Sequence, residues 1–444
     1  MYRFKPIQAL GVIGLTTLLI GCSSSGNPQS QQTSQEGGSL TGSPSHSEQV
    51  TVDIFNIQVE TREHLENLAT RYEQLNPHVT LRVQTIGGGA DTGAALQARF
   101  AANEAPTIWM LGGLSAVEQW QDHLLDISHT QAAQRAIAGT LDGATLNGVQ
   151  LGIPVNIEGF GWLYNTDIFA RAGIDTAAIN SFDAFEAAVH QLHAMRDELG
   201  IDSVFGFSGG EYWVWSQYSS HFLAQAYAGD IFAAARDTTL NWNGADVWMQ
   251  RYTDLIAAFS FNPVITVDYS MAIEDLFVNH RVAMTHQGNW VVPTLNGIDP
   301  GFAQNYLGIL PFFVQDQGTT GTIAAGPSWF WGINGTKDQA VIDAAVDFLD
   351  WLYTDPEPMS SLINDFGWIP AHEGNDPGLI AAPVSRRIYE MLENGQVTPW
   401  IHNSQPAGFA SNTLSPAFQR YVAGQSSWSE LLDTLATAWE QARR

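Results

Sequence analysis

The chain has 444 residues, of which 45 are acidic and only 18 are Lys or Arg, so its formal net charge is −27. Proteins that bind nucleic acid displace counterions with clustered Lys and Arg, and this charge balance therefore argues against nucleic-acid binding. Charged residues make up 14% of the chain, below the usual quarter, whereas 15 residues are Trp. Low charge with many aromatic rings suits a protein that offers flat apolar faces to a neutral, hydroxylated ligand.

Residues 1–21 have the organisation of a secretory signal peptide. Arg3 and Lys5 precede an apolar stretch that is shorter than the roughly 20 residues needed to cross a bilayer, and Gly21 stands directly before Cys22. This ending resembles a bacterial lipobox, in which the cysteine thiol receives a diacylglycerol and the preceding peptide is removed. Cys22 is the only cysteine, which leaves no disulfide framework and no thiol catalyst. We therefore expect an extracytoplasmic protein, anchored by lipid at Cys22 to the cell surface or to the periplasmic side of the membrane.

Residues 22–49 are expected to form a disordered linker after the lipidated cysteine. The segment is rich in Ser, Gln and Gly, lacks aromatic residues, and contains Leu40 as its only branched aliphatic residue. Such a composition cannot bury enough apolar surface to offset the entropy of ordering the chain. A flexible coil of this length would reach roughly 30 Å.

The first 60 residues after the linker alternate between strands and helices. The patterns predict strands at 50–59, 79–86 and 107–111 and helices at 62–75 and 94–102. A β-α-β-α-β order implies a parallel sheet with helices on its faces, and ligands of such sheets bind at the carboxyl ends of the strands. Those ends carry the first three candidate ligand-binding residues: Gln58, Asp91 and Gly112.

Further helices and one strand are predicted along the rest of the chain. The clearest is an amphipathic helix at 181–199, for which Ser181 is a suitable N-cap. The strand is expected at 281–285. The remaining helices are predicted at 247–259, 273–279, 338–353 and 429–442.

Three segments in matching order carry a family resemblance. Residues 153–165 lead from a proline-led strand into a "YN.D.F" pattern, Tyr164-Asn165-Thr166-Asp167-Ile168-Phe169. Residues 276–290 follow an "F..G..AM...G.W" pattern, in which His280-Arg281 replaces the usual Gly-Lys. Residues 326–334 read GPSWFWGIN and precede a helix rich in Ala. Together these segments resemble family 1 extracellular solute-binding proteins of bacterial ABC transporters, over about residues 50–400.

The resemblance implies an α/β, two-lobed, periplasmic-binding-protein-like fold, with a hinge of crossing segments and a ligand cleft between the lobes. The chain would cross between the lobes near Glu158, Gly321 and Trp368, and such hinges let ligand binding close the cleft. The implied boundaries are 50–157 plus 322–355 for the N-terminal lobe and 158–321 plus 356–444 for the C-terminal lobe.

Within the family, the resemblance is to carbohydrate binders of the maltose, multiple-sugar and raffinose types. It implies capture of a di- or oligosaccharide and delivery to membrane permease subunits, by a monomer without cofactor or resident metal. Glu158 lies where a sugar-bonding glutamate is found, Trp290 where a tryptophan stacks on a pyranose, and Tyr212 where a tyrosine packs on the sugar. Flat rings cover the apolar face of a pyranose, while carboxylates and amides accept hydrogen bonds from its hydroxyls. The other candidates are Asn289, Trp213, Trp215, Trp329 and Trp368, whereas Trp109 and Trp439 are expected in the core.

Other functions stay open at this point. Gly206-Phe207-Ser208-Gly209-Gly210 matches the G-x-S-x-G motif of serine hydrolases, but Gly209-Gly210 is a poor start for the helix that must follow. A glycoside hydrolase would need two carboxylates, for which Glu60, Asp91, Glu158 and Glu211 are available. A binder of peptides, polyamines or metal is a further alternative, because fold alone does not fix the ligand. No HExxH motif supports a metal site, and Gly87-Gly88-Gly89 lacks the Lys-Ser/Thr of a phosphate loop. We expect a binding protein rather than an enzyme.

Overall fold

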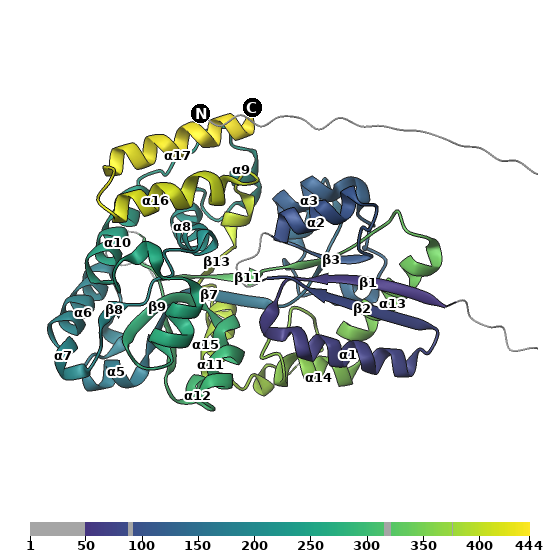
Figure 1. Ribbon diagram of the computed structural model, residues 1–444, viewed down its shortest axis with the longest axis horizontal. Helices are drawn as coiled ribbons and strands as arrows, with labels where there is room; N and C mark the ends of the chain where they lie inside the picture. The colour runs from purple at the N-terminus through teal and green to yellow at the C-terminus, as the bar shows by residue number, and fades with distance from the viewer. Residues whose placement is uncertain (1–48, 88–91, 315–320, 375) are drawn as a thin grey trace, which may run out of the picture. The chain divides into compact units, whose positions relative to one another are not determined.

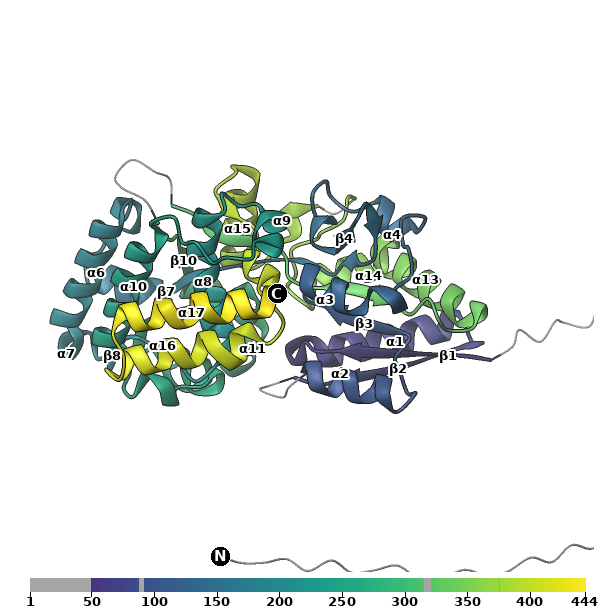
Figure 2. The same cartoon turned by 90° about the horizontal axis from the view of Figure 1, so that it is seen from above.

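The computed structural model describes residues 49–87, 92–314, 321–374 and 376–444. The expected signal peptide, Cys22, nearly all of the linker and Asp91 lie outside these residues. Within them, the chain builds two main β-sheets, each covered by helices (Figures 1 and 2).

The first sheet has the strand order β2-β1-β3-β12-β6. The predicted β-α-β-α-β opening forms its parallel part, because β1 pairs in parallel with both β2 and β3. Strand β12 then pairs antiparallel with β3 and with β6. The strands are β1 Val50–Asn56, β2 Val79–Thr85, β3 Ile108–Leu111, β6 Ile153–Pro154 and β12 Phe330–Ile333.

Helices cover both faces of this sheet, because alternate residues of β1 are apolar on opposite sides. Val52 and Ile54 join the core beneath α1 and α13, whereas Phe55 packs in a second cluster with α2 and α3. Figure 1 shows α1 and α2 on opposite sides of the strands. We call this sheet and its helices the N-terminal lobe. The helices are α1 Arg62–Leu75, α2 Thr92–Ala101, α3 Leu114–Trp120, α4 Gln131–Gln134, α13 Gln339–Thr354 and α14 Pro356–Asn364; a hairpin of β4 Thr145–Leu146 and β5 Val149–Gln150 adjoins them.

The second sheet is built around the long strand β7, which pairs antiparallel with β9 on one side and with β11 and then β10 on the other. Almost every residue of β7 is buried, as expected for a central strand covered on both faces. Strands β8 and β13 extend the sheet in parallel with β9 and β11. The strands are β7 Ile157–Asn165, β8 Ser203–Phe205, β9 Val282–Gly288, β10 Leu307–Leu310, β11 Ile323–Pro327 and β13 Val397–Thr398.

Neighbouring residues of β7 belong to different cores. Trp162 packs with α6, α8 and α10, and Leu163 packs on the other face with α11 and α15. The last two helices, α16 and α17, lie side by side against the first of these cores (Figures 1 and 2). We call this sheet and its helices the C-terminal lobe. The helices are α5 Thr166–Arg171, α6 Phe182–Ala194, α7 Arg196–Leu199, α8 Tyr212–Ala226, α9 Ile231–Arg236, α10 Ala245–Phe259, α11 Val292–Ile298, α12 Phe302–Asn305, α15 Pro383–Glu393, α16 Ser415–Val422 and α17 Trp428–Arg443.

Three chain segments cross between the lobes side by side. The Val155 amide donates to the Trp329 carbonyl (2.9 Å), and the Ile157 amide donates to the Ile369 carbonyl (2.8 Å). The first crossing therefore lies near Glu158 and the third near Trp368, and these hydrogen bonds join the crossings into a connected hinge.

Two of the expected lobe boundaries differ from the pairing in the structure. Residues 322–327 do not belong to the first sheet, because β11 is buried beside β7 and pairs with it, so the second crossing follows Pro327 rather than Gly321. Helix α14 packs on α13 and contributes Leu362 to the core of the N-terminal lobe, so the chain leaves that lobe near Trp368 rather than at residue 356.

Most predicted elements agree with the structure to within a few residues, and two differ in kind. Ser181 caps α6 as expected, accepting a hydrogen bond from the Ala184 amide (3.2 Å), but the predicted 181–199 helix is interrupted at Met195. The segment predicted as a helix at 273–279 is a π-helix, η6 Met271–Phe277. In the part of the chain that the structure describes, no helix combines the length and hydropathy needed to span a membrane.

Candidate functional site

Side chains from both lobes meet beside the hinge, at the carboxyl ends of the parallel strands. Gln58 and the short helix η1 (Val59–Thr61) follow β1, and Gly112 follows β3. Helix η1 lies against α11 of the C-terminal lobe. We use the name interlobe site for this region, comprising Gln58, Glu60 and Glu158 together with the aromatic residues described below.

Glu158 is the central polar group of the hinge. Its Oε1 accepts hydrogen bonds from Gln58 Nε2 and Asn156 Nδ2, both at 3.1 Å. The side chain is only 3% exposed. Burial raises the pKa of the Glu158 carboxyl, and hydrogen bonds from Ser328, Asn156 and Gln58 lower it in part. In this conformation the carboxyl therefore connects the N-terminal lobe to the crossing segments.

Glu158→Ala should cost more than Glu158→Gln, both in the free energy of unfolding and in ligand affinity. Alanine leaves two buried amide donors without an acceptor, at about 1–3 kcal/mol each, whereas glutamine retains one oxygen acceptor. Chemical denaturation and ligand titration of both variants check the order. Equal losses for the two variants would contradict the hydrogen-bonding role of Oε1.

Four aromatic rings of the C-terminal lobe form a row that we call the aromatic row: Tyr269, Trp213, Trp290 and Trp400. Successive ring centroids are 6.1, 6.4 and 6.0 Å apart. The first three residues are partly exposed, and Trp400 is 8% exposed. The indole N–H of Trp400 donates to the Glu158 carbonyl (3.3 Å), which joins one end of the row to the hinge.

Trp290 is held in place by its neighbours. Its indole N–H donates to Gln287 Oε1 (2.9 Å), and its ring lies directly against Gly288, where a Cβ atom would overlap it. Asn289 is buried and accepts a hydrogen bond from the Gly159 amide at Oδ1 (2.9 Å). Asn289 therefore ties the turn that carries Trp290 to the start of β7.

Trp329 and Gly112 occupy the N-terminal side. The Trp329 ring is partly exposed and packs on Gly112, where a Cβ atom would lie 3.1 Å from the ring. Gly112 thus contributes space for Trp329 rather than a ligand-contacting side chain. Tyr212, at the start of α8, is 45% exposed.

Two tryptophans expected at the ligand are core residues instead. Trp215 has no exposed surface, stacks on Phe418 with ring centroids 4.8 Å apart, and donates its N–H to the Gly209 carbonyl (2.9 Å). Trp368 is 6% exposed and packs with Phe366 in the core of the N-terminal lobe. Both rings are removed from solvent because helices pack over them. The predicted core positions of Trp109 and Trp439 are confirmed, since both are fully buried.

Sequence reasoning missed Tyr269 and Trp400 and considered Glu60 only as a catalytic carboxylate. Tyr269 and Trp400 lie in irregular segments, where no periodicity singles out a ring from its neighbours. Glu60 is partly exposed, but surrounding protein raises the pKa of its carboxyl to about 7, and the charge of Glu158 adds to this shift. Burial raises the pKa of the Tyr269 hydroxyl, a hydrogen bond with Thr294 lowers it in part, and the charge of Glu60 adds to the rise.

Three histidines lie behind the site, around Phe160 of β7. His221 Nε2 and His286 Nε2 are 3.2 Å apart, and the rings of His221, His286 and His402 all lie within 5.7 Å of the Phe160 ring. Burial lowers the pKa of all three, to about 3 for His286 and His402. Among the described residues, no group of His, Cys, Asp or Glu has the arrangement of a metal site.

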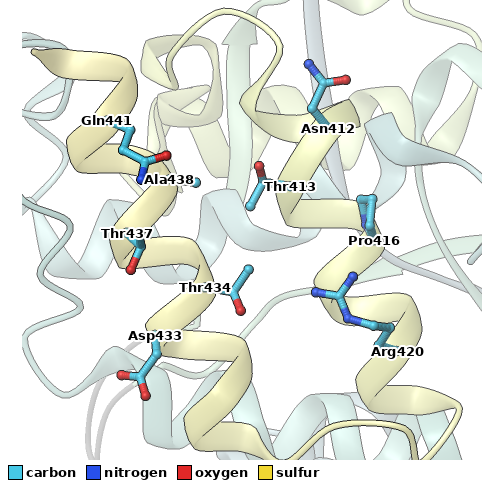
Figure 3. Close-up of a pocket in the computed structure, with 9 residues that line it drawn as sticks. All are labelled: Asn412, Thr413, Pro416, Arg420, Asp433, Thr434, Thr437, Ala438 and Gln441. Carbon is cyan, nitrogen blue, oxygen red and sulfur yellow. The ribbon is translucent and has the colours of Figure 1, made fainter.

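Two other features fall outside the interlobe site. Ser208 of the G-x-S-x-G motif is fully buried, which removes it as an exposed nucleophile. A groove also runs between α16 and α17 (Figure 3), and Arg420 points into it. None of the candidate site residues lines this groove, whose walls are Asn412, Thr413, Pro416, Arg420, Asp433, Thr434, Thr437, Ala438 and Gln441.

Comparison with known proteins identifies the family. The sequence model of the bacterial extracellular solute-binding proteins matches residues 67–378, and the chain belongs to this family. A multiple sugar-binding protein of Streptococcus mutans is 20% identical over 364 residues, covering 73% of this chain and 74% of that protein.

Solved structures share the two-lobed fold. A chitin oligosaccharide binding protein superposes with a TM-score of 0.76 at 22% identity, covering 89% of this chain and 99% of its own. The solute-binding protein RafE in complex with raffinose gives a TM-score of 0.72 at 19% identity, covering 89% of this chain and all of its own. The expected fold, two lobes joined by a hinge of crossing segments, is thereby confirmed.

Proposed function

We propose that this protein is the substrate-binding component of an ABC importer and captures a di- or oligosaccharide at the interlobe site. The observation that carries the proposal is the aromatic row, which is partly exposed and is joined to the hinge by the hydrogen bond from Trp400 to the Glu158 carbonyl. Rings cover the C–H faces of successive pyranoses, and the polar groups accept hydrogen bonds from hydroxyls. The named relatives support a saccharide over a peptide, a polyamine or a metal.

The ligand-binding role is assigned to a smaller set of residues than the sequence suggested. Trp213, Trp290 and Trp329 are partly exposed and are proposed to contact the saccharide, as is Glu60. Glu158 and its partner Gln58 are proposed to hold the hinge, and Asn289 to position Trp290. Tyr212 is proposed as a contact at the rim, where its exposed ring stands next to Trp213 in the chain.

Closure of the two lobes around the ligand is proposed as the signal for delivery. Outside the hinge, the lobes also touch where the Ser115 hydroxyl donates to the Gln405 carbonyl (2.8 Å). A ligand that contacts both lobes would favour the closed arrangement. Permease subunits in the membrane would then recognise the closed protein, which we propose acts as a monomer.

A thermal-shift screen of the purified protein against mono-, di- and oligosaccharides tests the proposal. A ligand that binds only the folded protein at 100 times its Kd adds about 2.7 kcal/mol to the free energy of unfolding. We expect stabilisation by at least one oligosaccharide and by no peptide or polyamine. Stabilisation by a peptide alone would reject the saccharide assignment.

We further propose that the protein is anchored outside the cytoplasm by lipid at Cys22 and has no enzymatic activity. Cys22→Ala should shift the protein from the membrane fraction to the soluble fraction and leave saccharide affinity unchanged, because the site lies in residues far along the chain. Cell fractionation with immunoblotting, followed by titration of the released protein, checks both parts. Retention of the variant on membranes would show that another anchor exists.

A further inference from the structure

We propose that the interlobe site takes a saccharide bearing a basic amino group, of the amino-sugar class, in preference to a neutral saccharide of the same length and linkage. The inference rests on the proposed function and specifies the charge of the ligand, which that function leaves open. It is carried by acidic side chains next to the aromatic row, one of which, Glu211, is hydrogen-bonded to Trp213 and to Tyr269.

The carboxyl groups around the site are paired with neutral partners. Glu158 Oε1 accepts from two amides, and Glu211 accepts from the Trp213 indole N–H and from the Tyr269 amide, each at 3.2 Å. Every ion pair among the described residues joins other side chains. No Lys or Arg of the described residues therefore forms an ion pair with Glu60, Glu158 or Glu211.

Glu60 is the acidic group best placed to meet a ligand. It stands on η1, which lies against α11 of the C-terminal lobe, and it is partly exposed. With a pKa raised to about 7, its carboxyl is divided between the charged and neutral forms near neutrality. A cation beside Glu60 would stabilise the charged form, whereas a neutral ligand that displaces water would not.

The aromatic row adds a second attraction for a cation. An ammonium group within about 6 Å of a ring centroid is attracted by the negative face of the ring, and more strongly where water is excluded. Tyr269 and Trp213 are neighbours in the row, and Glu211 accepts hydrogen bonds from both residues. An amine at this place would meet both a carboxylate and an aromatic face, whereas a hydroxyl would form only an ordinary hydrogen bond.

Three β-1,4-linked tetrasaccharides provide a matched test, because they differ only at C2. These are the tetramers of glucosamine, N-acetylglucosamine and glucose, and their affinities are measured by calorimetric titration at neutral pH. We expect the glucosamine tetramer to bind about tenfold more tightly than the glucose tetramer, the difference between a charged and a neutral hydrogen bond. The difference should shrink as salt is added.

Glu60→Gln should remove most of the difference between the two tetramers, because it deletes the charge and keeps the shape. Glu104→Gln is the matched control: this exposed residue precedes β3, at the opposite end of the parallel strands from Glu60, and the variant should keep the difference. A difference that persists in Glu60→Gln would overturn the assignment to Glu60.

Equal or weaker binding of the glucosamine tetramer would overturn the amino-sugar inference. If none of the three tetramers binds while another neutral saccharide stabilises the protein in the thermal-shift screen, this inference fails and the proposed function stands. If no saccharide of any kind binds, both fail.

Discussion

Trp290→Ala is expected to weaken saccharide binding by about 2–4 kcal/mol, the usual effect of removing a central aromatic anchor. Trp290 lies in the middle of the aromatic row, between Trp213 and Trp400, and is partly exposed. Its ring is fixed by the hydrogen bond to Gln287 and by contact with Gly288, so little conformational entropy is lost when a pyranose stacks on it. Calorimetric titration of wild type and variant measures the change.

Two control variants separate stacking from packing. Trp290→Phe retains a flat ring and should lose less affinity than Trp290→Ala. Trp351→Ala removes a partly buried ring that packs on Tyr72 in the N-terminal lobe, and it should lower the free energy of unfolding without changing affinity. Unchanged affinity in Trp290→Ala would remove this residue from the proposed site.

The second large effect is a loss of stability in acid caused by the histidines behind Phe160. His286 is fully buried, and burial lowers its pKa to about 3, against about 6.5 in the unfolded chain. The unfolded state therefore binds the proton more strongly, and stability is lost as the pH falls below about 6.5. The slope is about 1.4 kcal/mol per pH unit, or about 2 kcal/mol between pH 6.5 and 5 for this one residue. His221, whose pKa is also lowered by burial, adds in the same direction.

The carboxyl of Glu60 opposes this loss of stability in acid, and its contribution must be measured separately. The pKa of Glu60 is raised to about 7, so its contribution to stability is fully present below about pH 4.5 and is lost as the pH rises through 7. Denaturant unfolding as a function of pH, compared between variants, isolates each residue. His286→Gln should make the loss of stability towards acid shallower, and Glu60→Gln should make it steeper. Parallel pH profiles for wild type and His286→Gln would contradict the buried neutral state of this histidine.

Local patterns account for the parts of the fold that the sequence predicts well. The helix at 62–75 is bounded as expected, because Leu65, Leu68 and Tyr72 occur at helical spacing and all three are buried. The sequence predicts the second crossing between the lobes near Gly321, whereas in the structure it follows Pro327. Its position depends on the pairing of β11 with β7, a contact between segments about 160 residues apart that no local pattern reveals.

The candidate site is only partly readable from the sequence for a similar reason. A tryptophan is apolar enough for a core and flat enough for a sugar, so Trp215 and Trp290 look alike in the chain. Packing distinguishes them: Trp215 is covered by α16 through Phe418, whereas Trp290 stands at the end of β9 beside the hinge. The position of Glu158 in the first crossing predicts a polar role for it, but the hydrogen bonds that it accepts from Gln58 and Asn156 depend on the folded hinge.

One titration tests whether the protein binds a saccharide reversibly and without cleaving it. The saccharide that gives the largest thermal shift is titrated into the wild-type protein in a calorimeter. The saccharide is then recovered from the calorimeter's sample cell and analysed by chromatography. We expect a saturable heat with one site per chain, a Kd in the micromolar range or below, and full recovery of the intact saccharide. Heat that continues after saturation, with shorter sugars in the recovered solution, would identify a glycoside hydrolase and contradict this expectation.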